Sequence, residues 1–316
     1  MRAGWETGSI KTDEERIEAV DFASGIGLDT LILSRPTKAM VSHTHDKGMQ
    51  IIASISPFAD DAFKSKYPHA VQKVRPYEEN IVSAIDGQPW VGIHGKSYMW
   101  QTYLLPRRPM CYTHRESMTE FKRRIDTALD VADGVALDGF GYSNYYACFC
   151  DRCCDIRAQA ASPEFSETEV LGQTSAQTLV DVHRDLHDYA KSIKPDAIVT
   201  NHIWPKFLPD EYVGYRYKLD YCTQTISWFY PPEWRLERVE FEATENKRLE
   251  NPDNNRFVPF IGIVDMDGLV RKPERLATEI EIALRHGEGS LVLSRLWTLQ
   301  THPELADAAR KALKSR

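Results

Sequence analysis

The chain has 316 residues, of which 42% are hydrophobic and 27% are charged, as is typical of a globular protein with one large core. Its 39 Lys and Arg residues against 46 Asp and Glu residues give a net charge of −7, which argues against a nucleic-acid or anionic-membrane partner because such partners favour a basic face. No apolar run approaches the roughly 18 residues of a membrane span, and the N-terminal segment lacks the apolar core of a signal peptide, so we expect a soluble, cytoplasmic protein.

Eight short apolar runs are predicted to form β-strands. Most of them are continuous rather than alternating, as is typical of parallel strands that are covered on both faces. A parallel sheet is therefore expected. The runs span residues 3–6, 30–33, 51–55, 135–137, 197–200, 220–223, 260–264 and 290–293.

Amphipathic segments separate these runs. Apolar residues recur at helical spacing between 121 and 129, between 179 and 186, and between 276 and 284. Thr12 and Glu15 have the spacing of a capping box, which predicts that a first helix begins there.

The alternation of strand and helix, repeated eight times, predicts a single (β/α)8 TIM barrel over residues 1–316. A doubly wound open sheet is the alternative, but no Gly-x-Gly-x-x-Gly follows the first run. Two longer insertions, about 56–108 and 148–169, follow the third and fourth strands. In a barrel, both would lie on the face that carries the active site.

Cysteine spacing gives the sharpest local signal. Cys148, Cys150 and Cys153 form a Cys-x-Cys-x-x-Cys turn soon after the fourth strand, and Cys111 lies upstream. Such a turn can direct three thiolates at one point, and a fourth thiolate would complete the tetrahedral coordination of zinc. The sequence therefore predicts a zinc site.

The fourth ligand stays open at this point, because Cys154 or His114 could take the place of Cys111. A cluster of unligated thiols is the alternative to a metal site, although a reducing compartment favours metal over a disulfide. Four thiolates leave no open position for water, so the expected zinc holds loops in place and takes no part in chemistry.

The segment from Arg107 to about Arg157 resembles the family-42 β-galactosidases, which are retaining glycoside hydrolases. That family carries an Arg-Arg-x-x-Cys-type loop, a helix, a strand that ends at catalytic residues, and a Cys-Tyr-Cys-x-x-Cys turn. Because related galactosidases often oligomerise, the resemblance also admits a homo-oligomer. The family's cysteines form a structural zinc site, which the resemblance transfers to Cys111, Cys148, Cys150 and Cys153. The matching features here are Arg107-Arg108 with Cys111, the helix around 121–129, the strand 134–137 with Asp138, and Cys148-Phe149-Cys150 with Cys153.

The end of the fourth strand departs from that family. The family has an Asp-Asn-Glu-like triplet whose Glu is the acid/base, whereas this chain reads Asp138-Gly139-Phe140, with Phe140 about where the Glu would be. Other barrel glycosidases, such as the α-galactosidase and α-fucosidase groups, place an Asp nucleophile at the end of strand four. Asp138 fits that pattern.

Glycoside hydrolysis usually needs two carboxyl groups across the scissile bond. In a barrel, the C-terminal ends of the strands converge on one mouth. Asp138 follows the fourth strand and Asp265 follows the seventh, so we predict that these two residues form the catalytic pair. Which of the two donates the proton stays open. For Asp265, the alternative to a catalytic role is that of a turn or helix-capping residue.

Aromatic and polar residues near the strand ends predict a saccharide site. Flat indole faces match the C–H faces of sugar rings, and an indole N–H can reach a hydroxyl. Core packing and salt bridges are the competing roles for such residues. The predicted substrate-binding residues are Trp5, Glu6, Asn201, His202, Trp228, Arg295 and Trp297.

The sequence therefore predicts a glycoside hydrolase with a structural zinc near the mouth of the barrel. The alternative is a barrel that binds a sugar or a partner without catalysis. Phe140 supports this alternative, because the loss of a carboxylate removes chemistry and leaves binding intact.

Overall fold

The computed structural model describes residues 1–6, 12–76, 78, 108–204, 212–228, 233–266 and 269–314. Eight parallel strands close into a barrel, which confirms the predicted (β/α)8 fold. The barrel strands are β1 (Arg2–Glu6), β2 (Thr30–Leu33), β3 (Gln50–Ile55), β4 (Gly134–Asp138), β5 (Ile198–His202), β6 (Tyr221–Ser227), β7 (Arg256–Gly262) and β10 (Leu291–Ser294). Around the barrel they follow the order β1-β10-β7-β6-β5-β4-β3-β2.

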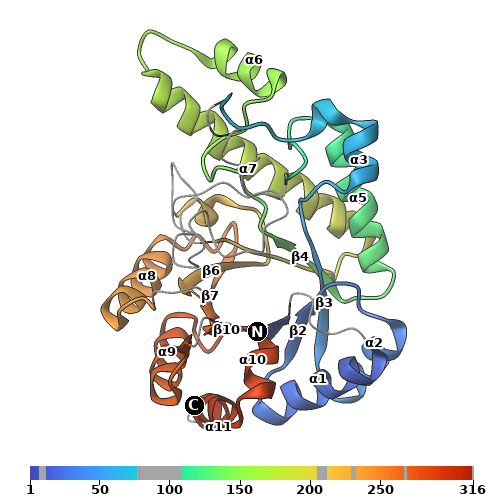
Figure 1. The fold of residues 1–316 in the computed structure, drawn as a ribbon, viewed down its shortest axis with the longest axis vertical. Helices are drawn as coiled ribbons and strands as arrows, with labels where there is room; N and C mark the ends of the chain where they lie inside the picture. Colours follow the sequence, from blue (N-terminus) through green and yellow to red (C-terminus); the bar gives the residue numbers. More distant parts are fainter. Residues whose placement is uncertain are drawn as a thin grey trace.

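Helices surround the barrel (Figure 1). The three stretches of predicted helical spacing lie in α5, α7 and α9, and their apolar positions are buried. Of the described helices, none combines the length and apolarity that crossing a membrane requires. The helices are α1 (Asp13–Ile26), α2 (Lys38–Asp46), α3 (Asp61–Lys66), η1 (Pro68–Ala70), α5 (Arg115–Leu129), α6 (Asp151–Ala160), α7 (Glu167–Ile193), η3 (Val213–Arg216), α8 (Leu236–Leu249), α9 (Pro273–His286), α10 (Leu296–Thr301) and α11 (Pro303–Lys314).

The first helix begins where its sequence predicts. The Thr12 side chain accepts a hydrogen bond from the Glu15 backbone N–H, and the Glu15 carboxylate accepts one from the Thr12 N–H, so the capping box is confirmed. The helix stops at Gly27, whose φ of 98° lies in the left-handed region that glycine adopts without a steric penalty.

Side chains of the barrel strands alternate between two apolar layers, because successive residues of a strand point to opposite faces. Those that point outward pack beneath the helices in the main core. Asp138 lies two residues after an inward-pointing alanine of β4, so it also points into the barrel, at its C-terminal end. The layer inside the barrel consists of Ala3, Trp5, Ile32, Ile52, Ala136, Val258, Phe260 and Val292.

The connections after β3 and β4 are long, as predicted, and they are bonded to each other. The Phe149 backbone N–H donates to the carbonyl of Lys73 at 2.8 Å. The Gln72 side chain accepts from the Ser143 N–H at 3.1 Å and donates to the Gly141 carbonyl at 3.1 Å. Because both connections leave the C-terminal ends of their strands, they form one wall of the barrel mouth.

A short hairpin follows β7. It consists of β8 (Asp265–Met266) and β9 (Leu269–Val270), which pair antiparallel outside the barrel sheet. The hairpin carries Asp265, so this predicted catalytic residue lies on the connection that leaves the C-terminal end of β7.

Candidate active site at the barrel mouth

The end of β4 places Asp138 beside a buried histidine of β5. The strand register pairs Asp138 with His202, and Nδ1 of His202 lies 3.3 Å from Oδ1 of Asp138. His202 is buried, whereas the Asp138 carboxylate is partly exposed. The structure therefore joins two of the predicted site residues, and the carboxylate stays accessible at the C-terminal end of the barrel.

The hydrogen bonds around His202 fix where its protons lie. The Thr225 hydroxyl donates its only proton to the Ile203 carbonyl at 2.9 Å, so its oxygen accepts from Nε2 of His202 at 3.1 Å. A neutral imidazole with a proton on Nε2 has none on Nδ1. One proton is therefore shared between Nδ1 of His202 and Oδ1 of Asp138. Burial lowers the pKa of His202, against the opposing effect of Asp138, and so disfavours the doubly protonated imidazolium.

Aromatic rings enclose His202. Its ring stacks on Phe260 with centroids 3.8 Å apart, and the rings of Trp5 and Trp228 lie 5.4 Å and 6.3 Å away. Both tryptophans are buried. The Trp5 indole N–H has no hydrogen-bond partner among the described residues. These rings surround the Asp138–His202 pair with an apolar medium, which strengthens its electrostatic interactions.

The ends of β1 and β10 meet at the start of α10. The buried Glu6 carboxylate accepts a hydrogen bond from the Trp297 backbone N–H at 2.8 Å, and Arg295 is the N-cap of that helix. A carboxylate is favoured at this point because the backbone N–H groups of a helix N-terminus are otherwise unpaired. The Trp297 side chain is 48% exposed, so its indole face is open to solvent.

Asn201 lies on the opposite face of β5 from His202. Its Oδ1 accepts from the Thr223 N–H at 3.0 Å, and its Nδ2 is buried without a hydrogen-bond partner in the described part of the chain. The structure therefore places Asn201 between β5 and β6, away from the Asp138 side chain.

Asp265 also pairs with a histidine. Its Oδ2 lies 3.3 Å from Nε2 of His302, which connects α10 to α11. Both side chains are partly exposed. Sequence reasoning missed His302, because a single histidine between two helices carries no local pattern.

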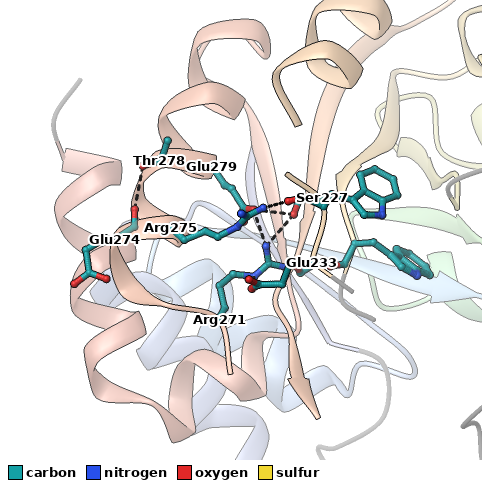
Figure 2. Close-up of polar contacts among 10 residues, drawn as sticks. Ser227, Glu233, Arg271, Glu274, Arg275, Thr278 and Glu279 are labelled. Carbon is teal, nitrogen blue, oxygen red and sulfur yellow. Dashed lines mark hydrogen bonds and ion pairs between the residues drawn. The ribbon is translucent and has the colours of Figure 1, made fainter. Parts of the chain in front are cut away.

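A buried arginine holds the ends of β6 and β7 together (Figure 2). Nη1 of Arg271 donates to Oε1 of Glu279 at 2.6 Å and to Oγ of Ser227 at 3.1 Å. Nη2 donates to the carbonyls of Trp228 and Gly262 at 3.0 and 2.9 Å. One side chain thus connects α9 with the C-terminal ends of two barrel strands.

Glu233 and Arg275 complete this network (Figure 2). Oε1 of Glu233 lies 3.0 Å from Nε of Arg271, and Nε of Arg275 donates to Oε1 of Glu279 at 3.0 Å. The Arg275 guanidinium also donates to the Trp234 carbonyl. Burial raises the pKa of Glu279 and lowers that of Arg271, because each charge has left water. Two cations and two carboxylates balance the charge, which a buried site requires.

The network also fixes the position of the Asp265 hairpin. The Arg271 backbone N–H donates to the Val264 carbonyl at 2.9 Å, directly before Asp265. Sequence reasoning missed this network, although Glu279 gives a signal for it. That glutamate lies on the same apolar face of α9 as Leu276, where a charged residue indicates a buried ion pair.

The four cysteines predicted as zinc ligands gather at one point beside this mouth. Sγ of Cys111 lies 3.5 Å from Sγ of Cys150 and 3.5 Å from Sγ of Cys153. All four Sγ atoms, including that of Cys148, lie within 4.8 Å of one another and are buried. With Zn–S bonds of about 2.3 Å, the sulfurs of a tetrahedral site are about 3.8 Å apart, so one ion fits this cluster.

The chemistry of the four sulfurs also suits a cation. Hydrogen bonding with Cys111 lowers the pKa of Cys150 and raises the pKa of Cys148. Metal ligands are thiolates, so a divalent cation would bind all four sulfurs in the deprotonated form. Cys154 is exposed and lies outside the cluster, and Nε2 of His114 lies 3.6 Å from Sγ of Cys150. Among the ligands that sequence left open, Cys111 therefore completes the set.

Comparison with solved structures shows that the fold is shared with glycoside hydrolases. The β-galactosidase of the Antarctic haloarchaeon Halorubrum lacusprofundi superposes with a TM-score of 0.68 at 15% identity, covering 99% of this chain and 58% of its own. The α-L-fucosidase isoenzyme 2 of Paenibacillus thiaminolyticus gives 0.62 at 14% identity, covering 100% and 50%. The glycoside hydrolase domain of PelA from Pseudomonas aeruginosa gives 0.50 at 12% identity, covering 93% and 95%.

These likenesses confirm the predicted resemblance to barrel glycoside hydrolases at the level of the fold, and the four-cysteine cluster is present. The chain spans 58% and 50% of the lengths of the galactosidase and the fucosidase. No family model and no curated protein sequence matches the chain.

Proposed function

We propose that the chain is a glycoside hydrolase that acts on a saccharide at the barrel mouth, with Asp138 as the proton donor and Asp265 as the second carboxylate. The observation that supports this most is the Asp138–His202 pair. It places a hydrogen-bonded, partly exposed carboxyl group at the C-terminal end of β4, in a barrel whose fold is shared with a β-galactosidase and a fucosidase. Active sites of such barrels lie at this end.

Hydrolysis needs a proton for the leaving oxygen and a carboxylate that attacks the anomeric carbon or activates water. Asp138 is proposed to give up the proton that it shares with His202, and its partly exposed carboxyl group can regain a proton from water. Asp265, oriented by His302, is proposed as the nucleophile or base. His202 is a positioning residue in this scheme, because its buried ring orients Asp138.

The other predicted residues take two proposed roles. Trp297 is proposed to stack on a sugar ring, because its indole face is exposed. Glu6 accepts a hydrogen bond at the start of the helix that carries it, and Arg295 lies at the N-cap of that helix. Three buried residues are proposed to shape the floor of the site. They are Trp5, His202 and Trp228.

We also propose that zinc is bound by Cys111, Cys148, Cys150 and Cys153. The four thiolates would leave no open position on the ion, so its role would be structural. Cys111 belongs to the connection after β3 and the other three to the connection after β4. Bound zinc would therefore cross-link the two connections that form this wall of the mouth and take no part in hydrolysis.

A sugar-binding barrel without catalysis is the second candidate. The observation in its favour is Phe140, which is buried and packs on Tyr112 and Phe121 with ring centroids 5.9 and 5.0 Å apart. Phe140 stands about where the family-42 β-galactosidases have their acid/base glutamate. Asp138 is then the carboxylate that this strand supplies.

The test is a screen of nitrophenyl glycosides and oligosaccharides against the wild type, Asp138→Asn and Asp130→Asn. Asp130 is an exposed carboxylate at the C-cap of α5, so it is a matched control. The wild type should hydrolyse at least one compound, and Asp138→Asn should be slower by about 10²–10⁴-fold while it still binds the sugar in calorimetry.

Two outcomes contradict the proposal. Full turnover in Asp138→Asn excludes Asp138 as a catalytic residue. Sugar binding without hydrolysis of any compound by the wild type favours the second candidate.

A further inference from the structure

A second group of metal-ligating side chains lies beside the four-cysteine cluster. It consists of His69 in η1, His114 at the N-cap of α5, and Glu116 in the first turn of α5. Each offers one ligand atom, and the three atoms lie within 4.8 Å of one another. The rings of His69 and His114 meet edge to face, with centroids 5.4 Å apart.

The backbone holds these three residues in place. The carbonyl of Ala70 accepts from the Cys111 N–H at 2.7 Å and from the Ser117 hydroxyl at 3.2 Å. These two bonds fix the residue after His69 against the segment that carries His114 and Glu116. In Figure 1, the region of α3 lies next to α5. Because the backbone is fixed, small side-chain rotations suffice to bring the three ligand atoms to the roughly 3.3 Å separations around one ion.

An ion pair alone does not explain this arrangement. Nε2 of His69 and Oε1 of Glu116 form an ion pair at 3.7 Å, and the ring of His114 lies against that of His69 without being needed for this pair. By contrast, the surface pair of His43 and Asp21 closes to 2.9 Å and involves one histidine. Two imidazoles and one carboxylate at one point supply the nitrogen and oxygen ligands that zinc takes in proteins.

We propose that His69, His114 and Glu116 form a second metal site, which binds a divalent transition ion such as zinc and is distinct from the cysteine cluster. Two histidines and one glutamate are a known donor set for zinc, and three protein ligands leave a coordination position open for water. The site is partly exposed, so an ion can enter it from solvent. Nε2 of His114 faces Cys150 and lies 3.6 Å from its Sγ. The other ring nitrogen of His114 is the one proposed to bind the second ion.

The test counts zinc ions on the full chain. Protein saturated with zinc and then freed of excess metal is titrated with zinc in calorimetry, and bound zinc is measured by elemental analysis. The wild type should bind a second ion. His69→Ala and Glu116→Gln should each weaken that second binding by more than about tenfold, because the loss of a ligand costs at least as much as the loss of an outer partner.

Control variants separate this site from the cluster. His43→Ala removes an exposed histidine with a carboxylate partner and should leave both ions bound. Cys150→Ser should remove the ion of the cluster and leave the His69-dependent ion. Retention of the cluster ion in His69→Ala shows that this variant is folded.

The proposal is overturned if the wild type binds no second ion. It is also overturned if His69→Ala and Glu116→Gln both bind the second ion as tightly as the wild type does. No readout in this test depends on hydrolysis. Its failure is therefore distinct from a failure of the proposed glycosidase activity.

Discussion

The two sides of the barrel mouth carry the same pair of side chains in different surroundings. Asp138–His202 at β4 and β5 and Asp265–His302 beyond β7 both have a nitrogen–oxygen distance of 3.3 Å. The side chains of the first pair are 21% and 4% exposed, whereas those of the second are 31% and 25% exposed. Because water screens an exposed pair more strongly, equal distances have unequal electrostatic effects. The buried histidine is thus suited to orienting its partner carboxyl group, and the exposed pair to meeting substrate or water.

The supports of the two sides also differ. The β4 side is joined to the connection after β3 by the four cysteines, whereas the β7 side is held by the buried ion pair of Arg271 and Glu279. One support is proposed to depend on a metal, and the other depends on charge balance. Each support can therefore be removed while the other stays intact, and this separates their contributions to the site.

The largest effect is expected when the metal ligands on the β4 side are removed. Cys150→Ser should abolish zinc binding at the cluster and lower the free energy of unfolding by several kcal/mol. Structural zinc contributes about 10–16 kcal/mol in small isolated domains, and the barrel core already supplies part of that here. Metal analysis and urea unfolding measure the two effects.

Cys154→Ser is the matched control for this experiment, because Cys154 is exposed and outside the cluster. It should keep the metal and the stability of the wild type. A wild type that is fully folded and equally stable after chelation would show that the cysteines need no ion.

The two carboxylates are expected to give the next largest effect. Asp138→Asn and Asp265→Asn should each slow hydrolysis by about 10²–10⁴-fold, as the loss of an acid or base does. His202→Gln should cost more turnover than His302→Gln, because the exposed pair is screened by water. The values of kcat and KM on a substrate from the screen measure both differences. Near wild-type turnover in Asp265→Asn would remove the β7 side from the machinery.

The strand pattern was sufficient to predict the barrel, but not every strand boundary. The seventh strand was expected at 260–264, whereas β7 spans Arg256–Gly262. The difference arises from Pro259, which lacks a backbone N–H and usually marks the limit of a strand. The sixth strand was expected at 220–223, whereas β6 spans Tyr221–Ser227. Three of its last four residues are polar, a composition that favours a loop, but they are buried at the mouth.

Prediction of the site depended on which contacts are local. Asp138 and His202 were both expected at the mouth because neighbouring parallel strands end side by side. Their hydrogen bond, and the proton count that follows from Thr225, required coordinates. The contacts of Arg271 with Trp228 join residues far apart in the chain through a backbone carbonyl. Every residue supplies such a carbonyl, so sequence gives no signal for that bond.

The buried ion pair on the β7 side should give the next effect. Arg271→Met leaves the carboxylate of Glu279 buried without its main partner, and we expect a loss of about 3–5 kcal/mol in the free energy of unfolding. Arg285→Met is the control, since Arg285 forms an exposed pair with Glu240 and should cost at most about 1 kcal/mol. Urea unfolding measures both. Replacing both partners by Arg271→Met and Glu279→Leu should recover much of the loss, and a full-sized loss in the double variant would show that packing, not charge, is responsible.

The smallest effect is expected from pH, and it tests burial on the β4 side directly. Burial lowers the pKa of His183 in α7 from 6.5 to about 4, and it also lowers the pKa of His202. The unfolded chain takes up protons on both residues near pH 6.5, whereas the native protein takes them up only at lower pH. The free energy of unfolding therefore does not depend on the titration of these two residues above about pH 6.5. It decreases as the pH drops toward 4, by up to roughly 3 kcal/mol for His183.

His183→Gln and His202→Gln should each reduce this decrease in the free energy of urea unfolding between pH 7.5 and 4.5. A His202→Gln variant that loses stability with acid as steeply as the wild type would mean that His202 is already charged in the native protein, and the proton it shares with Asp138 would then belong to the imidazole.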